Sequence, residues 1–352
     1  MDAERPLVSF CVTCYNRYQY IEDALRTAFV QTYSPLEIVI SDDASTDGSQ
    51  KVIEALVEEY RKNHGRHNVV FLKNEKNLGC LGNTQRVYQA AHGELLIQAD
   101  GDDVFCPSRT SEVVDAWLKS GKKAVAVVNH AVAFTDDGSI VGFVRRTGGG
   151  TITAYSKRIL DLFKSIDLDL AKGAGDDAIF LRRVEMFGTS VCIPKILTCY
   201  RWGSGATTKH AKNVLGQYRK VMIKGGFTSE MAAIRQLRND VEDVRHLIGD
   251  EKAEDLLSEY RDKYRYYEDC MVLWDSGSIM QRWKMFAKLY FLKERLMLQI
   301  IGVFLCLPRF IGDRFLDAMY DISLLLKNLK YRSLPKLCFD DLNALESRCE
   351  TF

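Results

Sequence analysis

The first hundred residues alternate between short apolar runs and segments whose apolar residues recur at helical spacing. An uninterrupted apolar run is typical of a strand that is buried on both faces, as the strands of parallel sheets are. Apolar residues three and four positions apart instead indicate the buried stripe of a helix. The alternation predicts a mostly parallel α/β sheet with helices on both faces. The predicted strands are 7–13, 36–41, 69–72 and 94–99, and the predicted helices are 21–31, 52–57 and 83–92.

Acidic residues follow two of these strands at the point where each strand ends. Asp42 and Asp43 come after the second predicted strand, and Asp100, Asp102 and Asp103 come after the fourth. Ligands of such sheets bind beyond the carboxyl ends of the strands. Placing these carboxylates in one crevice costs repulsion, which a divalent cation would offset. Because Mg²⁺ and Mn²⁺ commonly bridge carboxylates to substrate phosphates, the expected substrate is a phosphorylated nucleotide.

The pattern changes twice further along the chain. From about residue 124 strands and loops dominate, and they include a run of three glycines at 148–150 and a helix expected over 177–187. From about residue 213 the apolar spacing is helical throughout. We therefore expect an α/β domain over residues 1–210 and an α-helical C-terminal region over 211–352.

The C-terminal region holds a strongly apolar segment, 296–307, within a longer basic and aromatic stretch, 282–336. The apolar segment is short of the roughly twenty residues that a membrane-spanning helix needs. Two interpretations of the basic stretch remain open. Its helices could lie on an anionic membrane surface through their lysine, arginine and aromatic side chains. They could instead pack as a helical bundle, and a second copy of this chain is a further candidate partner.

The composition bounds the class of protein. With 48 Lys and Arg against 47 Asp and Glu the net charge is +1, so no overall positive field favours a nucleic-acid partner. Hydrophobic residues make up 47% of the 352 residues, enough for a sizeable core. The first residues lack the basic and apolar segments of a secretory signal. We therefore expect a cytoplasmic protein whose ten cysteines are thiols.

Four other candidate sites fit the sequence less well. Residues 43–54 match the spacing of a calcium-binding loop, but a predicted strand precedes them where an EF-hand requires a helix. Cys11 and Cys14 form a C-x-x-C inside a strand-like run, without a second pair at zinc spacing. A dinucleotide-binding fold would need G-x-G-x-x-G after the first strand. A nucleotidyltransferase would carry a glycine-rich basic phosphate loop there, which 13–16 does not supply.

Taken together, the motifs of roughly the first 205 residues resemble the inverting glycosyltransferases of family 2, which have the GT-A fold. The resemblance implies a Rossmann-like α/β catalytic domain and the transfer of a sugar from a nucleotide donor to an acceptor hydroxyl. It is closest to the bacterial surface-polysaccharide type. The segments that carry it, in the family's order, are Val8-Ser9-Phe10-Cys11-Val12-Thr13-Cys14-Tyr15-Asn16, Ser41-Asp42-Asp43-Ala44-Ser45-Thr46-Asp47-Gly48-Ser49, Asn77-Leu78-Gly79, Gly93-Glu94, Asp100-Gly101-Asp102-Asp103, Pro107, Gly175-Asp176-Asp177, Arg183 and Tyr200-Arg201.

The resemblance also implies which residues hold the donor. Thr13 and Tyr15 would line the pocket of the nucleotide base. Asp43 would accept a hydrogen bond from a uracil-type N–H, so a UDP-sugar is the expected donor. Asp100 would contact the ribose or the donor sugar.

The same resemblance assigns the metal and the base. Asp102 would bind Mn²⁺ or Mg²⁺, with Asp103 as a second ligand or a brace of the site. Asp177 matches the family's catalytic base, although helix N-capping is an alternative role for both Asp176 and Asp177. Such a base takes the proton of the attacking acceptor hydroxyl, and a metal stabilises the leaving nucleoside diphosphate.

One position departs from the family's pattern. Tyr200-Arg201 is followed by Trp202-Gly203, where the family often has a histidine. A contact to the diphosphate from this region would then fall to Arg201, Lys209 or His210.

The sequence leaves the biological setting open to several hypotheses. We expect a glycan or lipid-linked glycan acceptor in cell-surface polysaccharide or lipopolysaccharide synthesis, at the inner face of the cell membrane. The alternatives are a nucleotidyltransferase and a non-catalytic sugar-nucleotide-binding scaffold of a glycan assembly complex. Intact Asp43, Asp102 and Asp177 argue against the scaffold.

Overall fold

The computed structural model describes residues 5–144, 150–203, 225–275 and 278–290 of the chain. These residues form two compact units. The first unit comprises the described residues up to 168 together with 175–203, and the second comprises 169–174 together with the described residues from 225 onward. The boundary expected near residue 210, the glycines at 148–149, Lys209, His210 and the apolar segment 296–307 lie outside the described residues.

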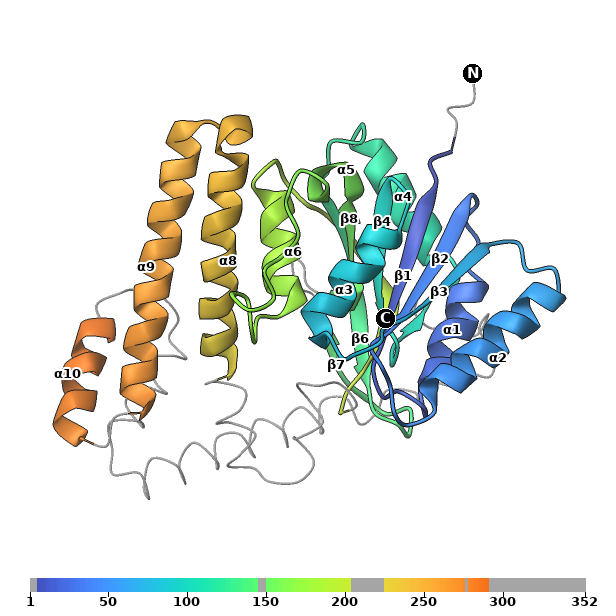
Figure 1. Ribbon diagram of the computed structural model, residues 1–352, viewed down its shortest axis with the longest axis horizontal. Coiled ribbons are helices and arrows are strands. Elements are labelled where there is room, and N and C mark those ends of the chain that lie inside the picture. The colour runs from blue at the N-terminus through green and yellow to red at the C-terminus, as the bar shows by residue number, and fades with distance from the viewer. Residues whose placement is uncertain (1–4, 145–149, 204–224, 276–277, 291–352) are drawn as a thin grey trace. The chain divides into compact units, whose positions relative to one another are not determined.

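The first unit is built on one mixed, mostly parallel sheet, so the predicted fold class is confirmed (Figure 1). The strand order is β3-β2-β1-β4-β8-β6-β9-β5, and β7 pairs with β6. The predicted parallel half is β3-β2-β1-β4, and the strands beyond it pair in both directions. The strands are β1 Val8–Cys14, β2 Leu36–Asp42, β3 Asn68–Lys73, β4 Leu95–Asp100, β5 Val104–Phe105, β6 Ala126–Phe134, β7 Ile140–Val144, β8 Thr153–Ser156 and β9 Val191–Arg201.

Helices cover both faces of this sheet. Right-handed crossovers place α1 and α2 on one face, and the crossover from β3 to β4 returns to the other face with α3. There α6 packs against α3 (Figure 1). The helices of the unit are α1 Ile21–Phe29, α2 Ser49–Lys62, α3 Gly79–Ala90, α4 Arg109–Lys119, α5 Lys157–Leu160 and α6 Asp176–Glu185, with a short 3₁₀ turn, η1, over Gly150–Ile152.

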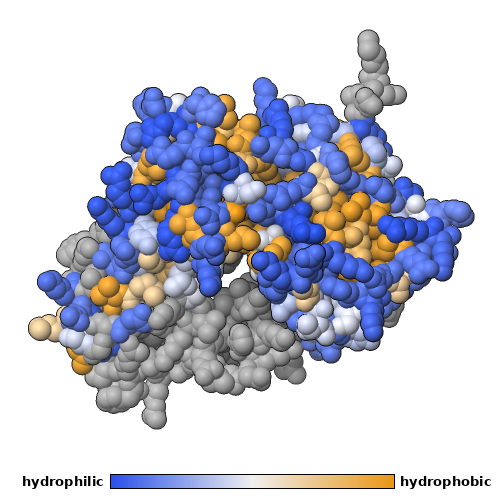
Figure 2. Space-filling model, in the orientation of Figure 1, coloured by the Kyte–Doolittle hydropathy of each residue, from blue (hydrophilic) through white to orange (hydrophobic). Residues whose placement is uncertain are grey.

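The apolar runs behave as the sequence predicts. All seven residues of β2 are buried, and β1 is buried at every position but one. At the sheet edge, β3 is less covered, since Val70, Phe71 and Leu72 are only half-buried. Figure 2 shows apolar side chains at the surface over this edge strand. The core therefore lies under β2, β1 and β4, the three strands that carry the candidate site.

The second unit is helical in its described part. It holds α8 Gly225–Ile248, α9 Asp250–Asp275 and α10 Ile279–Tyr290. Gly249, at a φ of +86°, makes the turn between α8 and α9, which pack against each other. Arg245 ties this turn together through ion pairs to Asp250 and Glu254. Across the described residues, no helix combines the length and the apolar character that crossing a membrane requires.

Candidate active site

Parallel register brings the two acidic runs to one edge of the sheet. Thr13 of β1 lies beside Asp100 of β4, and Cys14 lies beside Asp42 of β2. Beyond β4 the chain stays against β1, because the Gly101 N–H donates to the Thr13 carbonyl at 2.8 Å. Segments that are nearly ninety residues apart in the sequence therefore end side by side, as the predicted topology requires.

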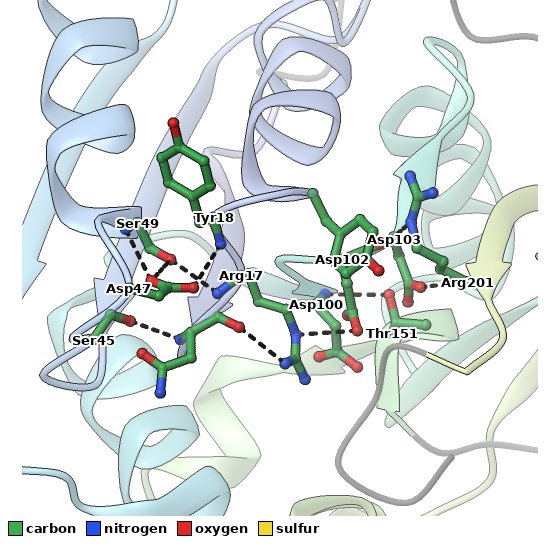
Figure 3. A network of polar contacts seen from close by, with 12 residues as sticks. Arg17, Tyr18, Ser45, Asp47, Ser49, Asp100, Asp102, Asp103, Thr151 and Arg201 are labelled. Carbon is green, nitrogen blue, oxygen red and sulfur yellow. Dashed lines mark hydrogen bonds and ion pairs between the residues drawn. The ribbon is translucent and has the colours of Figure 1, made fainter. Parts of the chain in front are cut away.

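The loops that leave β1 and β2 are cross-linked to each other. Side chains of the second loop accept hydrogen bonds from consecutive backbone N–H groups of the first (Figure 3). Ser45 and Asp47, two of the residues at calcium-loop spacing, are used for this purpose. The three bonds run from Asn16 N to Ser45 Oγ at 2.8 Å, from Arg17 N to Ser49 Oγ at 2.9 Å and from Tyr18 N to Asp47 Oδ2 at 2.9 Å.

Asp43, the predicted partner of the nucleotide base, is fixed by its neighbours. Its Oδ1 accepts hydrogen bonds from Asn74 Nδ2 and from Leu78 N, both at 2.8 Å. The residue is buried. Tyr15, at the exit of β1, is 45% exposed, so its ring is open to a stacking ligand. These placements suit a base pocket, while the roles of Thr13, Tyr15 and Asp43 stay predictions.

Asp102 faces a cation. Its Oδ2 lies 3.1 Å from Arg17 Nε, and both side chains are largely buried (Figure 3). Burial raises the pKa of the Asp100 carboxyl to about 8, and the negative charges of Asp176 and Asp102 add to the rise, whereas Arg17 opposes it. Burial and the neighbouring carboxylates therefore favour the protonated form of Asp100, while Arg17 favours its charged form.

Asp103 points away from Arg17 and braces β9. Its Oδ1 accepts a hydrogen bond from Arg201 N at 2.8 Å, and the residue is fully buried. Burial and the charges of Asp102 and Asp100 raise its pKa well above its usual range. These contacts suit the bracing role better than the role of a second metal ligand, which stays untested.

Arg201 completes the brace. Its Nε donates to the Asp102 carbonyl at 2.9 Å, and its guanidinium pairs with Asp23 at 3.0 Å. The guanidinium carbon lies 4.6 Å from the centre of the Tyr20 ring and 4.7 Å from that of Phe134. Arg201 is thus committed to holding the turn after β4, which disfavours the hypothesis that it contacts the diphosphate.

The adjacent aspartates of α6 have different surroundings. Asp176 is buried, and its Oδ2 accepts hydrogen bonds from Thr84 Oγ1 at 2.9 Å and from Gln98 Nε2 at 2.6 Å. Its Oδ1 accepts one from Asp177 N at 2.9 Å. Asp177 is exposed in the first turn of the helix. Asp176 therefore ties the helix to β4, the strand that ends in Asp100, and leaves Asp177 accessible to a ligand.

The donor set suits a hard divalent cation. In the part of the chain that the structure describes, no three His, Cys, Asp or Glu residues group closely enough to hold a metal by themselves. Mg²⁺ and Mn²⁺ sites often use one or two carboxylates and complete their coordination with substrate phosphates and water. Asp102 offers such a carboxylate at the edge, and its pairing with Arg17 shows that a cation is accommodated beside it.

Sequence reasoning missed several residues of this edge. Neither Arg17 nor Asn74 is assigned a role from the sequence. Gln98 sits inside an apolar run, where a buried polar side chain with a partner is an unusual feature that could have drawn attention. Thr151, whose Oγ1 accepts from Asp100 N at 3.3 Å, has no local signal at all.

Comparison with known proteins shows what this domain is similar to. The model of the family described as Glycosyl transferase family 2 matches residues 9–165. EpsH of Bacillus subtilis (strain 168), which is named as a glycosyltransferase, is 25% identical over 266 residues, 69% of this chain and 73% of EpsH. TuaG of the same organism, named as a teichuronic acid biosynthesis glycosyltransferase, is 33% identical over 115 residues, 33% of this chain and 43% of TuaG. The match to TuaG thus spans less than half of that protein.

Two solved structures share the fold. The mannosyltransferase PcManGT of Pyrobaculum calidifontis, in complex with GDP-Man and Mn²⁺, has a TM-score of 0.51 at 16% identity over 93% of this chain and 88% of its own. TarS 1–349 of S. aureus, in complex with UDP-GlcNAc, has a TM-score of 0.51 at 13% identity over 90% of this chain and 92% of its own. At these identities the likeness establishes the fold alone.

Proposed function

Because residues 9–165 match the model of glycosyltransferase family 2, we propose that this chain is a member of that family and an inverting glycosyltransferase that moves a sugar from a UDP-sugar to an acceptor hydroxyl. The observation that carries the proposal is the meeting of Asp43, Asp100 and Asp102 at one edge of the sheet. Asp177 follows directly on the residue that anchors its helix to β4. Asp100, a proposed donor-binding residue, and Asp177, the candidate base, are therefore both connected to β4.

We assign the donor residues as follows. Thr13 and Tyr15 line the base pocket, and Asp43 accepts a hydrogen bond from the base. Asp100 contacts the ribose or the sugar. The nucleotide sugars bound by the two fold neighbours support the donor class. One neighbour binds UDP-GlcNAc and the other binds GDP-Man, so the two differ in the nucleotide base. Both nucleotides therefore belong in the test.

Asp177 is the proposed general base. An exposed carboxylate at the start of a helix can accept the proton of an acceptor hydroxyl as the oxygen attacks the anomeric carbon. Attack from the side opposite the leaving diphosphate inverts the configuration of that carbon. Asp176 holds the first turn of the helix so that the base does not drift, and this preorganisation lowers the entropic part of the barrier.

Asp102 is the residue that would hold Mn²⁺ or Mg²⁺, and Asp103 braces it from the β9 side. A divalent cation, when bound, supplies charge stabilisation for the leaving diphosphate. The Arg201 brace fixes the backbone of Asp102, so its carboxylate is kept at the edge before any ligand arrives.

For the acceptor we propose a glycan or lipid-linked glycan of a cell-surface polysaccharide, reached at the inner face of the membrane. The role of TuaG in teichuronic acid biosynthesis, as its name gives it, supports this class. The second unit is the proposed contact for the acceptor, for a second copy of the chain or for an anionic membrane surface.

Calorimetric titration with UDP and with GDP, each with and without Mn²⁺, tests the proposal. We expect metal-dependent binding of UDP in the micromolar range, lost in Asp102→Ala. Asp115→Ala is the matched control, because Asp115 is an exposed aspartate of α4, away from the strand ends. If the wild-type protein binds neither nucleotide, the transferase proposal fails and a non-catalytic scaffold becomes the better hypothesis.

A further inference from the structure

Arg17 brings a guanidinium group into the acidic edge. Its Nε contacts Asp102 Oδ2 at 3.1 Å, and one terminal nitrogen donates to the Asn16 carbonyl at 3.4 Å. Figure 3 shows the side chain extended from the loop after β1 toward Asp102, with Asp100 close by. Its positive charge also lowers the pKa of Asp100. With its side chain 18% exposed, Arg17 can reach a ligand at this edge.

The backbone under Arg17 is positioned in advance. Asn16 has a φ of +52°, in the left-handed region that Asn tolerates better than most residues, and this turns the chain toward the edge. The Asn16 side chain accepts a hydrogen bond from Thr46 N at 2.8 Å, and Arg17 N donates to Ser49 Oγ at 2.9 Å. The start of the side chain is therefore fixed, and its long stem can still change direction.

Among the described residues, two other arginines close to this edge already have hydrogen-bond or ion-pair partners. Arg201 is held by Asp23 and by the Asp102 carbonyl. Arg109 is fully buried under the sheet edge, where it donates to the carbonyls of Gln98 and Thr151 at 3.0 and 2.6 Å. Neither can turn to a ligand without leaving buried acceptors unpaired.

We infer that Arg17 is an exchangeable counter-ion, which pairs with Asp102 in the donor-free site and moves to the donor's diphosphate when Asp102 turns to the metal. The inference rests on the proposed function. It identifies Arg17 as a residue of this chain that contacts the diphosphate of the donor. A guanidinium forms paired hydrogen bonds to phosphate oxygens as readily as to a carboxylate. The exchange keeps each charge paired, because Asp102 gains the metal as Arg17 gains the diphosphate.

This exchange predicts effects of opposite sign on two ligands. Without Arg17, Asp102 loses one counter-ion and keeps Asp100 close by, so its attraction for a divalent cation rises. The diphosphate in turn loses a charged donor, which is worth on the order of 10- to 100-fold in affinity. A residue that only held the fold would weaken the binding of both ligands when replaced.

The experiment measures both ligands separately on the full-length chain. Binding of Mn²⁺ alone is followed by the paramagnetic resonance signal of the free ion. Binding of UDP, UMP and uridine, and of the guanosine series, is followed by calorimetry at saturating Mn²⁺. For Arg17→Gln we expect Mn²⁺ to bind about threefold more tightly or better. We expect UDP to bind at least ~10-fold more weakly, with uridine unchanged within about twofold.

Two further variants keep the test decisive. Arg17→Lys keeps the charge and loses the paired donors, so its UDP affinity should lie between those of wild type and Arg17→Gln. Arg26→Gln is the control, because Arg26 is an exposed arginine of α1 that pairs only with surface glutamates in the described contacts. Weaker binding of both ligands, or unchanged UDP binding, in Arg17→Gln overturns the inference while the transferase proposal stands. Wild-type protein that binds no nucleotide with Mn²⁺ overturns both.

Discussion

The neighbouring aspartates at the start of α6 should respond to substitution in opposite ways. Asp176→Ala removes a buried carboxylate that accepts hydrogen bonds from Thr84, Gln98 and Asp177 N. Asp177→Ala removes an exposed carboxylate from the first turn of the same helix. We expect the first substitution to lower the free energy of unfolding and the second to abolish sugar transfer with little change in stability.

The magnitude for Asp176 follows from its two buried donors, Thr84 Oγ1 and Gln98 Nε2. Hydrogen bonds to a charged acceptor contribute about 1.5–3 kcal/mol each, so their loss costs about 3–6 kcal/mol. Little repulsion between Asp176 and Asp100 is relieved, because burial favours the neutral form of Asp100. The net loss therefore stays at about 3–6 kcal/mol. Asp177 lies exposed in the first turn of the helix, where a carboxylate interacts favourably with the helix dipole by about 0.3–1 kcal/mol.

Urea denaturation followed by circular dichroism gives the free energy of unfolding of both variants and of wild type. Single-turnover assays with a nucleotide sugar and the acceptor give the transfer rate, which in Asp177→Asn should fall on the order of 10²- to 10⁴-fold with nucleotide affinity retained. The reasoning is refuted if Asp176→Ala is within about 1 kcal/mol of wild type. It is also refuted if Asp177→Ala loses as much stability as Asp176→Ala.

Two further substitutions test the geometry of the site and the pH dependence of the fold. A Cβ added at Gly101 would lie 2.8 Å from the Thr13 carbonyl oxygen, so Gly101→Ala should lower the free energy of unfolding by about 1–3 kcal/mol. Gly142 has open space where its Cβ would lie, so Gly142→Ala should cost less in the same urea assay. Burial lowers the pKa of His67 below the ordinary histidine value of about 6.5, although a hydrogen bond to the Gln31 carbonyl opposes the shift. Below about pH 6.5 the unfolded chain therefore binds a proton at His67 more readily than the folded chain does, so the free energy of unfolding of the wild type should fall as the pH drops. His67→Gln should flatten this fall between about pH 7.5 and 5.5. Parallel curves for the two proteins would contradict the assignment.

The regular part of the fold could be predicted because parallel strands and their helices leave strong patterns. The four predicted strands of the parallel half lie within two residues of β1, β2, β3 and β4. The helix bounds differ more, since α2 extends over Ser49–Lys62 beyond the apolar positions 52–57 that mark it, and α3 begins at Gly79 rather than at residue 83. Its first turn contains Gly79 and Gly82, both poor helix formers. Tertiary packing overrides that preference, since Leu81 is buried and a Cβ at Gly82 would touch Leu168.

The directions of the site side chains could not be predicted in the same way. Asp102 and Asp103 are neighbours in a turn, and nothing local decides that one faces Arg17 while the other faces β9. That choice depends on Arg201, which lies almost a hundred positions further along the chain. The family resemblance could name both aspartates as candidates, but only the packing of β9 separates a residue open to a ligand from a residue that braces the turn.

Two adjacent aspartate pairs of this edge follow one physical rule. In each pair one carboxylate is buried and accepts hydrogen bonds from a distant element, as Asp103 does from β9 and Asp176 from β4 and α3. The other member is held by its own backbone, since the Asp102 carbonyl accepts a hydrogen bond from Arg201 Nε and Asp177 N donates to Asp176 Oδ1. Burying a carboxylate costs free energy, which its donors must offset, and the gain is a fixed backbone at the adjacent position. Loss of a bracing aspartate should therefore lower both stability and transfer, whereas loss of the exposed Asp177 should lower transfer with little effect on stability.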